Sequence, residues 1–131
     1  MARKRKNSRK IKGTDRDDVL TGTKRRNVIW GYEGDDRIES GEGMDKAYGG
    51  PGDDTFVTVN DGKGYVKIMD FQAGDSIEFC GCSATTIEMR KGDSWIVKGD
   101  DVMAVVKGVD AVDLKIDFEE RVITFNFDLF A

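Results

Sequence analysis

Acidic side chains recur at a fixed interval in the first half of the chain. Asp18, Asp36 and Asp54 form one series, and Asn27 and Asp45 lie midway between its members. Carboxylates stacked at the spacing of neighbouring strands, about 4.8 Å, repel one another strongly unless a cation lies between them. Oxygen ligands from carboxylates and turn carbonyls suit calcium. The interval therefore predicts a row of cation sites built from oxygen ligands, provided that the chain coils so that alternate units stack.

The units that would position these acids are nonapeptide repeats. Cut every nine residues from Gly13, residues 13–57 give the consecutive blocks GTDRDDVLT, GTKRRNVIW, GYEGDDRIE, SGEGMDKAY and GGPGDDTFV. Glycine dominates the first position and recurs at the fourth, and Asp or Asn fills the sixth. The eighth position is apolar in every block, with Leu20, Ile29, Ile38, Ala47 and Phe56.

Each block predicts a tight turn followed by a very short strand. Glycine at the first and fourth positions permits backbone angles that other residues resist, and the eighth side chain points inward. One unit alone cannot bury its apolar residue, but stacked units can. With two blocks per turn, one edge of the resulting solenoid carries Asp18, Asp36 and Asp54, and the other carries Asn27 and Asp45.

These blocks resemble the RTX family, the hemolysin-type calcium-binding repeats of bacterial secreted proteins, whose pattern is G-G-x-G-x-D-x-U-x with a large aliphatic residue at U. GGPGDDTFV at 49–57 matches it almost completely. DFQAGDSI at 70–77 and the stretch from Gly92 through DDVMAVVKGVDAVDL resemble segments that follow the repeats in that family. The resemblance implies an all-β fold, namely a right-handed parallel β-roll over residues 13–57 capped by a C-terminal β-structure over residues 58–131, with several calcium ions as cofactor.

The resemblance also implies ligand sets. One turn gives the carbonyls of its second and fourth residues and its Asp, and the next stacked turn gives the carbonyls of its first and third residues and its Asp. The first site then comprises Tyr32, Gly34, Asp36, Gly49, Pro51 and Asp54, and the second comprises Thr14, Arg16, Asp18, Gly31, Glu33 and Asp36. A third would use Thr23, Arg25, Asn27, Ser40, Glu42 and Asp45, and a fourth Gly41, Gly43 and Asp45, completed by Asp61 or Asp70. Because Arg25 replaces Gly and Asn27 replaces Asp, the third site is the weakest, and the Asp36–Asp54 site is the strongest.

The region after the repeats reads as β-structure. Apolar, β-branched and aromatic runs between Gly-Asp turn motifs predict strands at Tyr65–Met69, Ile77–Phe79, Trp95–Val97, Val102–Val106 and Val122–Phe127. This region serves either as a cap alone or, as the resemblance implies, also as a C-terminal signal for a type I secretion apparatus and hence an extracellular location. Phe125, Phe127, Leu129 and Phe130 fit both readings.

The chain ends and the cysteines lead to further expectations. Residues 1–12 carry seven cations and no acid, so the remainder carries a net charge of −11 against −4 for the whole chain. This basic arm either binds nucleic acid or an anionic surface, or is a disordered solubilising arm. We favour disorder and consider nucleic acid the less favoured partner, because no aromatic residue is interleaved for base stacking. Cys80 and Cys82 are expected to be free thiols, since residues two apart form a strained bridge. No apolar run is long enough for a membrane span.

Two classes of function remain open. The first is a calcium-dependent folding module with a secreted accessory or structural role, and the second is an adhesion module whose roll surface binds a carbohydrate or protein partner. Clustering of Trp30, Tyr32 and Tyr48 on one face would favour the second class. Enzymatic activity is not expected, because the carboxylates are committed to the repeat and the chain contains no His. No feature predicts an oligomeric state.

Overall fold

The computed structural model describes residues 8–59 and 62–126, and strands dominate both stretches. The strands are β1 (Ser8–Lys12), β2 (Val19–Thr21), β3 (Arg26–Trp30), β4 (Arg37–Glu39), β5 (Gly43–Tyr48), β6 (Thr55–Val57), β7 (Gly64–Ile68), β8 (Ser76–Glu78), β9 (Thr85–Arg90), β10 (Asp93–Lys98), β11 (Asp101–Val106), β12 (Leu114–Asp117) and β13 (Val122–Phe125). A single 3-10 turn, η1 (Ala111–Asp113), precedes β12. Within these two stretches, no helix has the length and apolarity needed to cross a bilayer.

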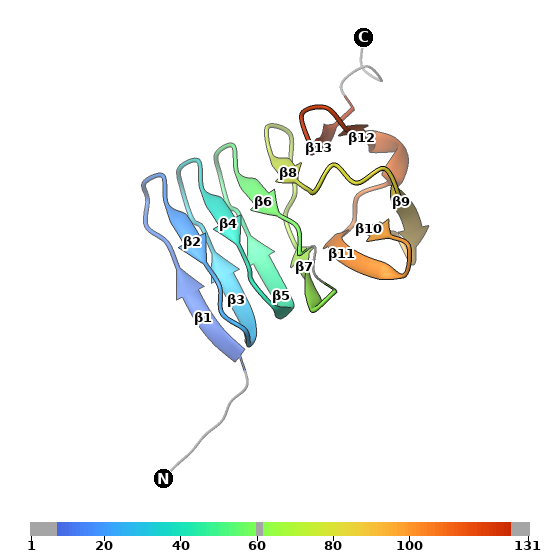
Figure 1. The fold of residues 1–131 in the computed structure, drawn as a ribbon. Coiled ribbons are helices and arrows are strands. Elements are labelled where there is room, and N and C mark those ends of the chain that lie inside the picture. The colour runs from blue at the N-terminus through green and yellow to red at the C-terminus, as the bar shows by residue number, and fades with distance from the viewer. Residues whose placement is uncertain (1–7, 60–61, 127–131) are drawn as a thin grey trace.

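The first eight strands form a coil that contributes alternately to two parallel sheets (Figure 1). Sheet A begins β1-β3-β5-β7, and sheet B contains β2, β4, β6 and β8 in that order from its edge. Val19 is the register partner of Arg37, and Arg37 of Thr55, so each of these turns takes two nonapeptide blocks. The expected parallel β-roll and its two blocks per turn are therefore confirmed.

The coil extends beyond the boundary expected at residue 57. Thr55 is the register partner of Ser76, and Gly43 of Gly64, so the last turn is longer than two nonapeptide blocks. The three additional residues fall between β6 and β7, where β6 ends at Val57 and β7 begins at Gly64. After this insertion the nine-residue period resumes, and the coil ends with β8 at Glu78.

The core of the roll is the column of eighth-position side chains. Each repeat strand turns its eighth-position residue inward, and the column continues past the three inserted residues. The buried column consists of Leu20, Ile29, Ile38, Ala47, Phe56, Ile68 and Ile77. The inward direction expected of the eighth position is thereby confirmed, and each short strand contributes one layer to a continuous core.

Glycine has two different roles in the turns. At the fourth position Gly34, Gly43 and Gly52 have φ of 95°, 92° and 112°, in the region that other residues resist. The first-position Gly49 does not have such a φ, which corrects the expectation for that position. Glycine is needed there because a β-carbon would collide with the carboxylate of Asp54.

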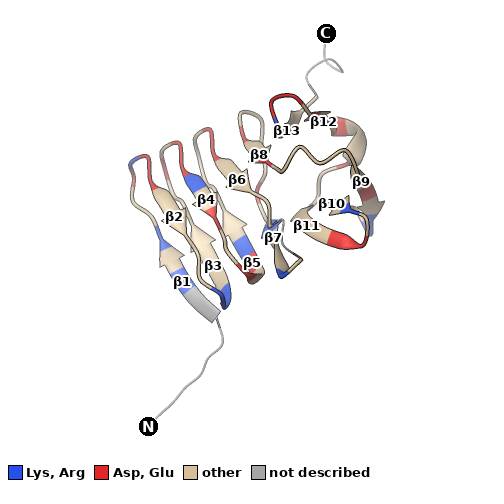
Figure 2. Ribbon diagram, in the orientation of Figure 1, with Lys and Arg blue, Asp and Glu red and all other residues tan. Residues whose placement is uncertain are grey.

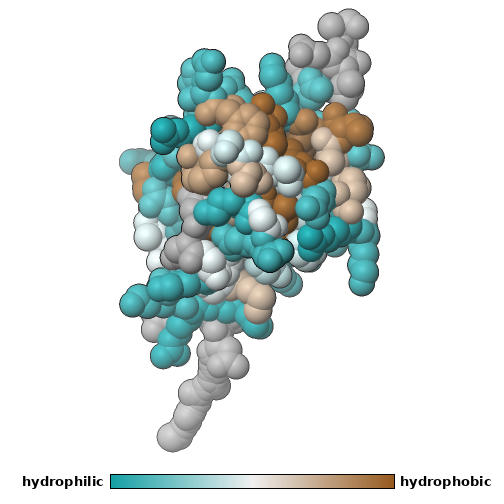
Figure 3. Space-filling view, turned by 45° about the vertical axis from the view of Figure 1, so that its right-hand side comes forward, coloured by the Kyte–Doolittle hydropathy of each residue, from teal (hydrophilic) through white to brown (hydrophobic). Residues whose placement is uncertain are grey.

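The C-terminal region caps the roll by extending both sheets. β9, β10 and β11 form an antiparallel meander, and β11 joins sheet A by pairing in parallel with β7. β13 pairs antiparallel with both β12 and β8, which extends sheet B. Figure 3 turns this end toward the viewer and shows apolar atoms gathered between hydrophilic ones. The expected β cap is confirmed, although β9 and β12 were not predicted, and β13 ends at Phe125 while Phe127, Leu129 and Phe130 lie outside the described residues.

The basic N-terminal segment is partly ordered, contrary to the expected disordered arm. β1 pairs in parallel with β3, and Ile11 is the register partner of Ile29. Ile11 packs against the core, so one apolar residue among the cations is enough to add a strand to the sheet. The correction applies to Ser8–Lys12, because residues 1–7 lie outside the described residues.

The two cysteines form a disulfide, which corrects the expectation of free thiols. Their Cα atoms are 5.2 Å apart, within the usual range for a bridge. Gly81 between them has φ of 73°, and this left-handed conformation brings the two residues to the required separation. The bridge lies in the connection between β8 and β9.

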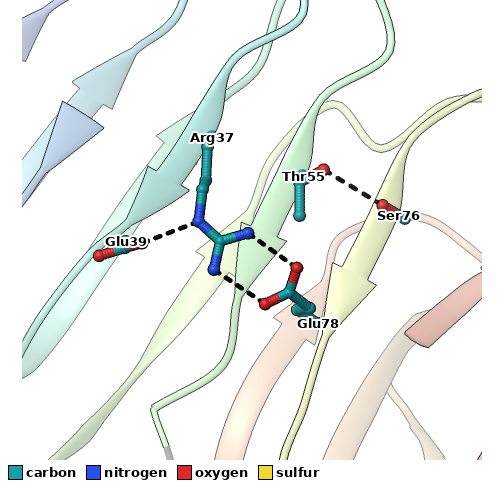
Figure 4. A network of polar contacts seen from close by, with 5 residues as sticks. All are labelled: Arg37, Glu39, Thr55, Ser76 and Glu78. Carbon is teal, nitrogen blue, oxygen red and sulfur yellow. Dashed lines mark hydrogen bonds and ion pairs between the residues drawn. The ribbon is translucent and has the colours of Figure 1, made fainter. Parts of the chain in front are cut away.

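An arginine on the outer face of sheet B links two coils across the one between them (Figure 4). The Arg37 guanidinium on β4 contacts both carboxylate oxygens of Glu78 on β8, at 2.7 and 2.8 Å, and Glu39 at 2.8 Å. These contacts raise the pKa of Arg37 and lower the pKa of Glu78. Exposed pairs of this kind usually contribute less than about 1 kcal/mol, so the bridge mainly fixes the register of β4 and β8 across β6.

We predict that the eighth-position column dominates the stability of the roll. Phe56 is fully buried, so Phe56→Ala should lower the free energy of unfolding by about 3–5 kcal/mol. Val19→Ala, at a position that is 69% exposed, should change it by less than about 0.5 kcal/mol. Urea unfolding at saturating calcium measures both, and equal effects would contradict the assignment of the core.

Candidate metal sites

The sixth-position side chains form a ladder along one edge of the roll. The backbone N–H of Asp18 donates to Oδ1 of Asp36 at 2.8 Å, and the N–H of Asp36 donates to Oδ1 of Asp54 at 2.9 Å. The N–H of Asp54 donates in turn to Oδ1 of Asp75 at 2.9 Å. In Figure 2 the acidic residues mark the turns that connect sheet A to sheet B along this edge. One oxygen of each upper carboxylate is thus committed to the backbone of the turn below.

The second oxygen of these carboxylates is left without a partner. Oδ2 of Asp36, Asp45 and Asp54 is buried and makes no hydrogen bond within the described residues. The residues themselves are 2%, 1% and 0% exposed. Burial raises the pKa of Asp54 to about 7 and of Asp45 to about 6, and it also raises the pKa of Asp36. A buried carboxylate oxygen without a donor is costly, and a bound cation would remove that cost.

Backbone carbonyls converge on the gap between the turns at 31–36 and 49–54. The Tyr32 oxygen lies 2.5 Å from where a β-carbon on Gly50 would sit, and the Gly34 oxygen is the atom nearest that position on Gly52. From the opposite side, the Gly49 oxygen lies 2.8 Å from the β-carbon position of Gly31, which also borders Asp36 Oδ2. Carbonyls of the lower turn therefore point up and one of the upper turn points down, which fits an oxygen-ligated cation.

The first expected ligand set stays a prediction, and the structure brings most of its residues together. Tyr32, Gly34, Asp36, Gly49 and Asp54 come from two directly stacked turns, and Pro51 is an exposed member of the upper turn. Among the described residues, no three His, Cys, Asp or Glu side chains gather into a group able to hold a metal. An ion in this gap must therefore take a large part of its coordination from backbone carbonyls.

The gap one turn lower has the same backbone frame but a different carboxylate. The Arg16 oxygen lies 2.6 Å from the β-carbon position of Gly34, and the Gly31 oxygen lies 2.8 Å from that of Gly13. The Asp18 carboxylate, however, already accepts the Thr14 N–H at 2.6 Å and the Thr14 hydroxyl. Glu33 is exposed on the upper turn. An ion here competes with Thr14, so we expect weaker binding than at the Asp36–Asp54 gap.

The opposite edge is poorer in ligands. Oδ1 of Asn27 accepts the Thr23 N–H at 2.9 Å, and its amide donates to the Thr23 hydroxyl at 3.2 Å. The Asn27 side chain is thus bonded within its own turn, next to Arg25. On the stacked turn above, Ser40, Glu42 and Asp45 face it with a single buried carboxylate. The third ligand set therefore lacks the two-carboxylate pair of the first.

The structure does not bring together the fourth expected set. Gly43 and Asp45 are the register partners of Gly64 and Val66, and Gly41 lies in the turn before them. Asp70 lies on the other edge, where its carboxylate accepts the N–H groups of Gly49 at 2.8 Å and Gly50 at 2.9 Å. Asp70 therefore cannot complete a site with Asp45, and Asp61 lies outside the described residues.

Asp75 is the ladder residue that sequence reasoning missed. DFQAGDSIE at 70–78 is a nonapeptide block with Asp at its sixth position and Ile at its eighth, and a three-residue shift of register would have revealed it. Asp75 also ends the ladder, because its Oδ2 accepts the Gln72 N–H at 3.0 Å. The Gln72 amide donates to the Gly50 carbonyl at 2.9 Å. Protein donors thus fill the positions that a further cation would need.

Comparison with known proteins agrees with this geometry. Residues 12–46 and 41–58 match the RTX calcium-binding nonapeptide repeat, in four copies. The chain carries RTX calcium-binding repeats. These RTX repeats form the first three turns of the roll, and the last turn lies mostly outside the matched region. No curated protein matches the sequence.

Two solved structures are similar to this chain at low sequence identity. The extracellular lipase LipA from Serratia marcescens matches with 21% identity and a TM-score of 0.48, over 85% of this chain and 20% of the lipase. The AlgE6R3 subunit of the mannuronan C5-epimerase from Azotobacter vinelandii matches with 23% identity and a TM-score of 0.46, over 76% of this chain and 75% of the subunit. The chain thus spans about a fifth of the length of the lipase.

We predict that Asp36 serves two ions. Asp36→Asn keeps the Oδ1 acceptor but removes a charge shared by both gaps, so calorimetry should show the loss of more than one ion's binding heat. Asp17→Asn is the matched control, since Asp17 is exposed on the same edge and accepts the Asp35 N–H at 2.7 Å. Asn27→Ala should lose no more than one ion's heat. Equal losses of binding heat for Asp36→Asn and Asp17→Asn would contradict the prediction that Asp36 binds two ions.

The raised pKa values predict that a fall in pH stabilises the calcium-free fold but weakens calcium binding. Without calcium, the folded state binds more protons than the unfolded state between the ordinary Asp value of 3.8 and about 7, so the free energy of unfolding should rise as pH falls through this range. With calcium, protons compete for the same carboxylates, so calcium affinity should fall over the same interval. The β-sheet circular dichroism signal of calcium-stripped protein, which should grow as pH falls, and calcium titration, both at several pH values, measure the two effects. A calcium affinity independent of pH would contradict the assignment of Asp54.

Proposed function

We propose that this protein is a non-enzymatic module whose roll folds when calcium enters the gaps between stacked turns. The observation that carries this proposal is the pair of unpartnered, buried Oδ2 atoms on Asp36 and Asp54, flanked by the carbonyls of Tyr32, Gly34 and Gly49. Without a cation, folding must bury these oxygens uncompensated in a body that carries a net charge of −11. Ions that bind only the folded state stabilise it, by about 2.7 kcal/mol per site at a hundredfold excess over Kd.

We further propose a secreted accessory or structural role. RTX repeats are a feature of bacterial secreted proteins, and this family resemblance supports export through a type I secretion apparatus. Coupling of folding to calcium also suits export, because a chain that stays unfolded in low calcium can cross a membrane before it folds. The disulfide between Cys80 and Cys82 is compatible with an oxidising destination.

A binding role for the roll surface is the second candidate. Trp30 on β3 and Tyr48 on β5 are register partners whose rings stack, with centroids 5.9 Å apart and an interplanar angle of 6°. Both point away from the core, since the residue before each of them on its strand, Ile29 or Ala47, points inward. Tyr32, which is 40% exposed, lies in a turn and not on this face. Two of the three aromatic residues therefore cluster as a partner-binding face would require.

Calcium and magnesium should differ in their ability to fold the roll. The proposed cages have carbonyls fixed by strand stacking, which suits ligand distances of about 2.3–2.6 Å better than the 2.0–2.1 Å octahedron of magnesium. Calcium should raise the β-sheet circular dichroism signal and the Tm at concentrations where a roughly tenfold excess of magnesium does not. Equal folding by both ions would mean that they only screen acidic repulsion, and an unchanged signal after chelation would refute calcium-driven folding.

A further inference from the structure

The outer face of the first four strands of sheet A is positively charged, although the whole chain is acidic. The residues that point inward on β3, β5 and β7 include Ile29, Ala47 and Ile68, so their neighbours point outward. Among the described residues, the charged side chains at outward positions of β1, β3, β5 and β7 are Lys10, Lys12, Arg26, Lys46 and Lys67. No carboxylate occupies such a position on these strands, and Figure 2 shows basic segments on all four. We call this surface the basic face.

The cations on the basic face lack counter-ions within it. Lys46 and Lys67 are direct register partners on β5 and β7, and Lys10 continues the same row on β1 across Val28. Like charges directly opposite one another on neighbouring strands are destabilising. No ion pair joins Lys46 or Lys67 to a carboxylate of the described residues. An anion lying between the two strands would relieve this repulsion.

A groove of about 390 Å³ crosses the basic face. It is lined by Arg26, Asn27 and Val28 of β3, by Met44, Asp45 and Lys46 of β5, and by Tyr65 and Lys67 of β7. Met44 and Tyr65 are register partners in one row of outward residues, and Val28, Lys46 and Lys67 are register partners in the next row, with the buried Asp45 between the two rows. Because each row runs from strand to strand, the groove follows the axis of the roll. Met44 is 48% exposed within it. The groove therefore offers a linear ligand a row of cations and, along the same path, apolar and aromatic contacts.

We propose that this groove binds single-stranded nucleic acid. Lysines in a row can track a phosphate backbone, while Tyr65, Met44 and the planar Arg26 guanidinium offer surfaces for unstacked bases. An acidic polysaccharide would use the cations, but its puckered rings match the planar Arg26 guanidinium and the Tyr65 ring less closely than flat bases do. An anionic bilayer is planar and would not use a groove. The combination of charge and apolar lining therefore selects a chain with both phosphates and bases.

This conclusion differs from the expectation for the basic arm because the fold changes which residues are neighbours. Along the sequence, no aromatic residue is interleaved with the cations of residues 1–12. In the roll, Lys12 on β1 is the register partner of Trp30, and Trp30 of Tyr48. The strand that ends the basic arm is thereby joined to the aromatic residues of the next two strands, and Lys10 and Lys12 extend the cationic surface toward the arm.

The test is fluorescence anisotropy of a labelled oligothymidylate with the full chain at saturating calcium. We expect binding that weakens with salt, and Lys46→Glu/Lys67→Glu should reduce affinity at least tenfold. Losing two phosphate contacts should also lower the slope of log affinity against log salt by about 1.4, at roughly 0.7 per contact. Lys91→Glu/Lys115→Glu makes the same charge change in the cap, where Lys91 lies in the turn between β9 and β10 and Lys115 lies on β12. This control variant should leave the affinity and the salt slope unchanged.

The aromatic wall provides a second variant pair. Tyr65→Ala should weaken binding roughly fivefold or more by removing a stacking surface, and Tyr65→Phe should retain it. Heparin and anionic phosphatidylserine vesicles serve as competitors of other classes. Displacement of the oligonucleotide at lower charge concentration by either competitor would overturn the choice of nucleic acid.

The remaining outcomes separate this proposal from that of calcium-driven folding. An unchanged affinity of the Lys46→Glu/Lys67→Glu variant for the oligonucleotide would show that the groove is not the binding site. The oligonucleotide would then bind to the basic arm, or to the acidic edge through bridging calcium ions. The inference rests on the folded roll, so circular dichroism is recorded on each sample. A roll that folds with calcium but does not bind overturns only the groove, whereas a roll that calcium does not fold refutes the proposed function itself.

Discussion

The burial of aspartate carboxylates, one above the next, is the constraint on which the rest of the roll depends. One oxygen of Asp54 accepts a backbone N–H from the turn below, and the other meets no donor. The first-position glycine is required because Asp54 folds back against Gly49. The carbonyl oxygens of Tyr32, Gly34 and Gly49 border the same gap. The glycine and aspartate positions of the nonapeptide pattern are thus largely those that are needed to enclose a buried charge.

The two edges of the roll meet this constraint in different ways. Along the Asp36–Asp54 edge, charge is buried without a protein partner and a cation is the natural complement. On the opposite edge, Asn27 replaces one carboxylate with an amide that is satisfied by Thr23. At the end of the acidic ladder, Gln72 and the backbone of Gly49 and Gly50 supply donors of their own. The roll therefore grades from turns with unpartnered carboxylate oxygens to turns whose carboxylates are satisfied by protein donors, without a change of backbone architecture.

Much of the roll follows from the sequence because its determinants are local and periodic. The spacing of two nonapeptide blocks between Asp36 and Asp54 predicted which turns stack, and the apolar eighth position predicted the core. Asp75 was missed because three inserted residues break the period, and Asp70 was assigned to the wrong edge for the same reason. The pairing of Cys80 with Cys82 depended on the conformation of Gly81, and β1 depended on the packing of Ile11, neither of which has a repeating signature.

The two ends of the coil are protected unequally. β7 and β8 continue into the cap through β11 and β13, whereas β1 and β2 are the outermost described strands of their sheets and pair on one side only. Since each turn contacts chiefly its neighbours, opening is a one-dimensional process that costs least at a free end. Amide protection against hydrogen exchange should therefore form a gradient that rises from Leu20 toward Ile77. Local unfolding should therefore begin at β1 and β2 and proceed turn by turn toward the cap. The rate at which these terminal strands pair again then governs how often the opening spreads to the next turn.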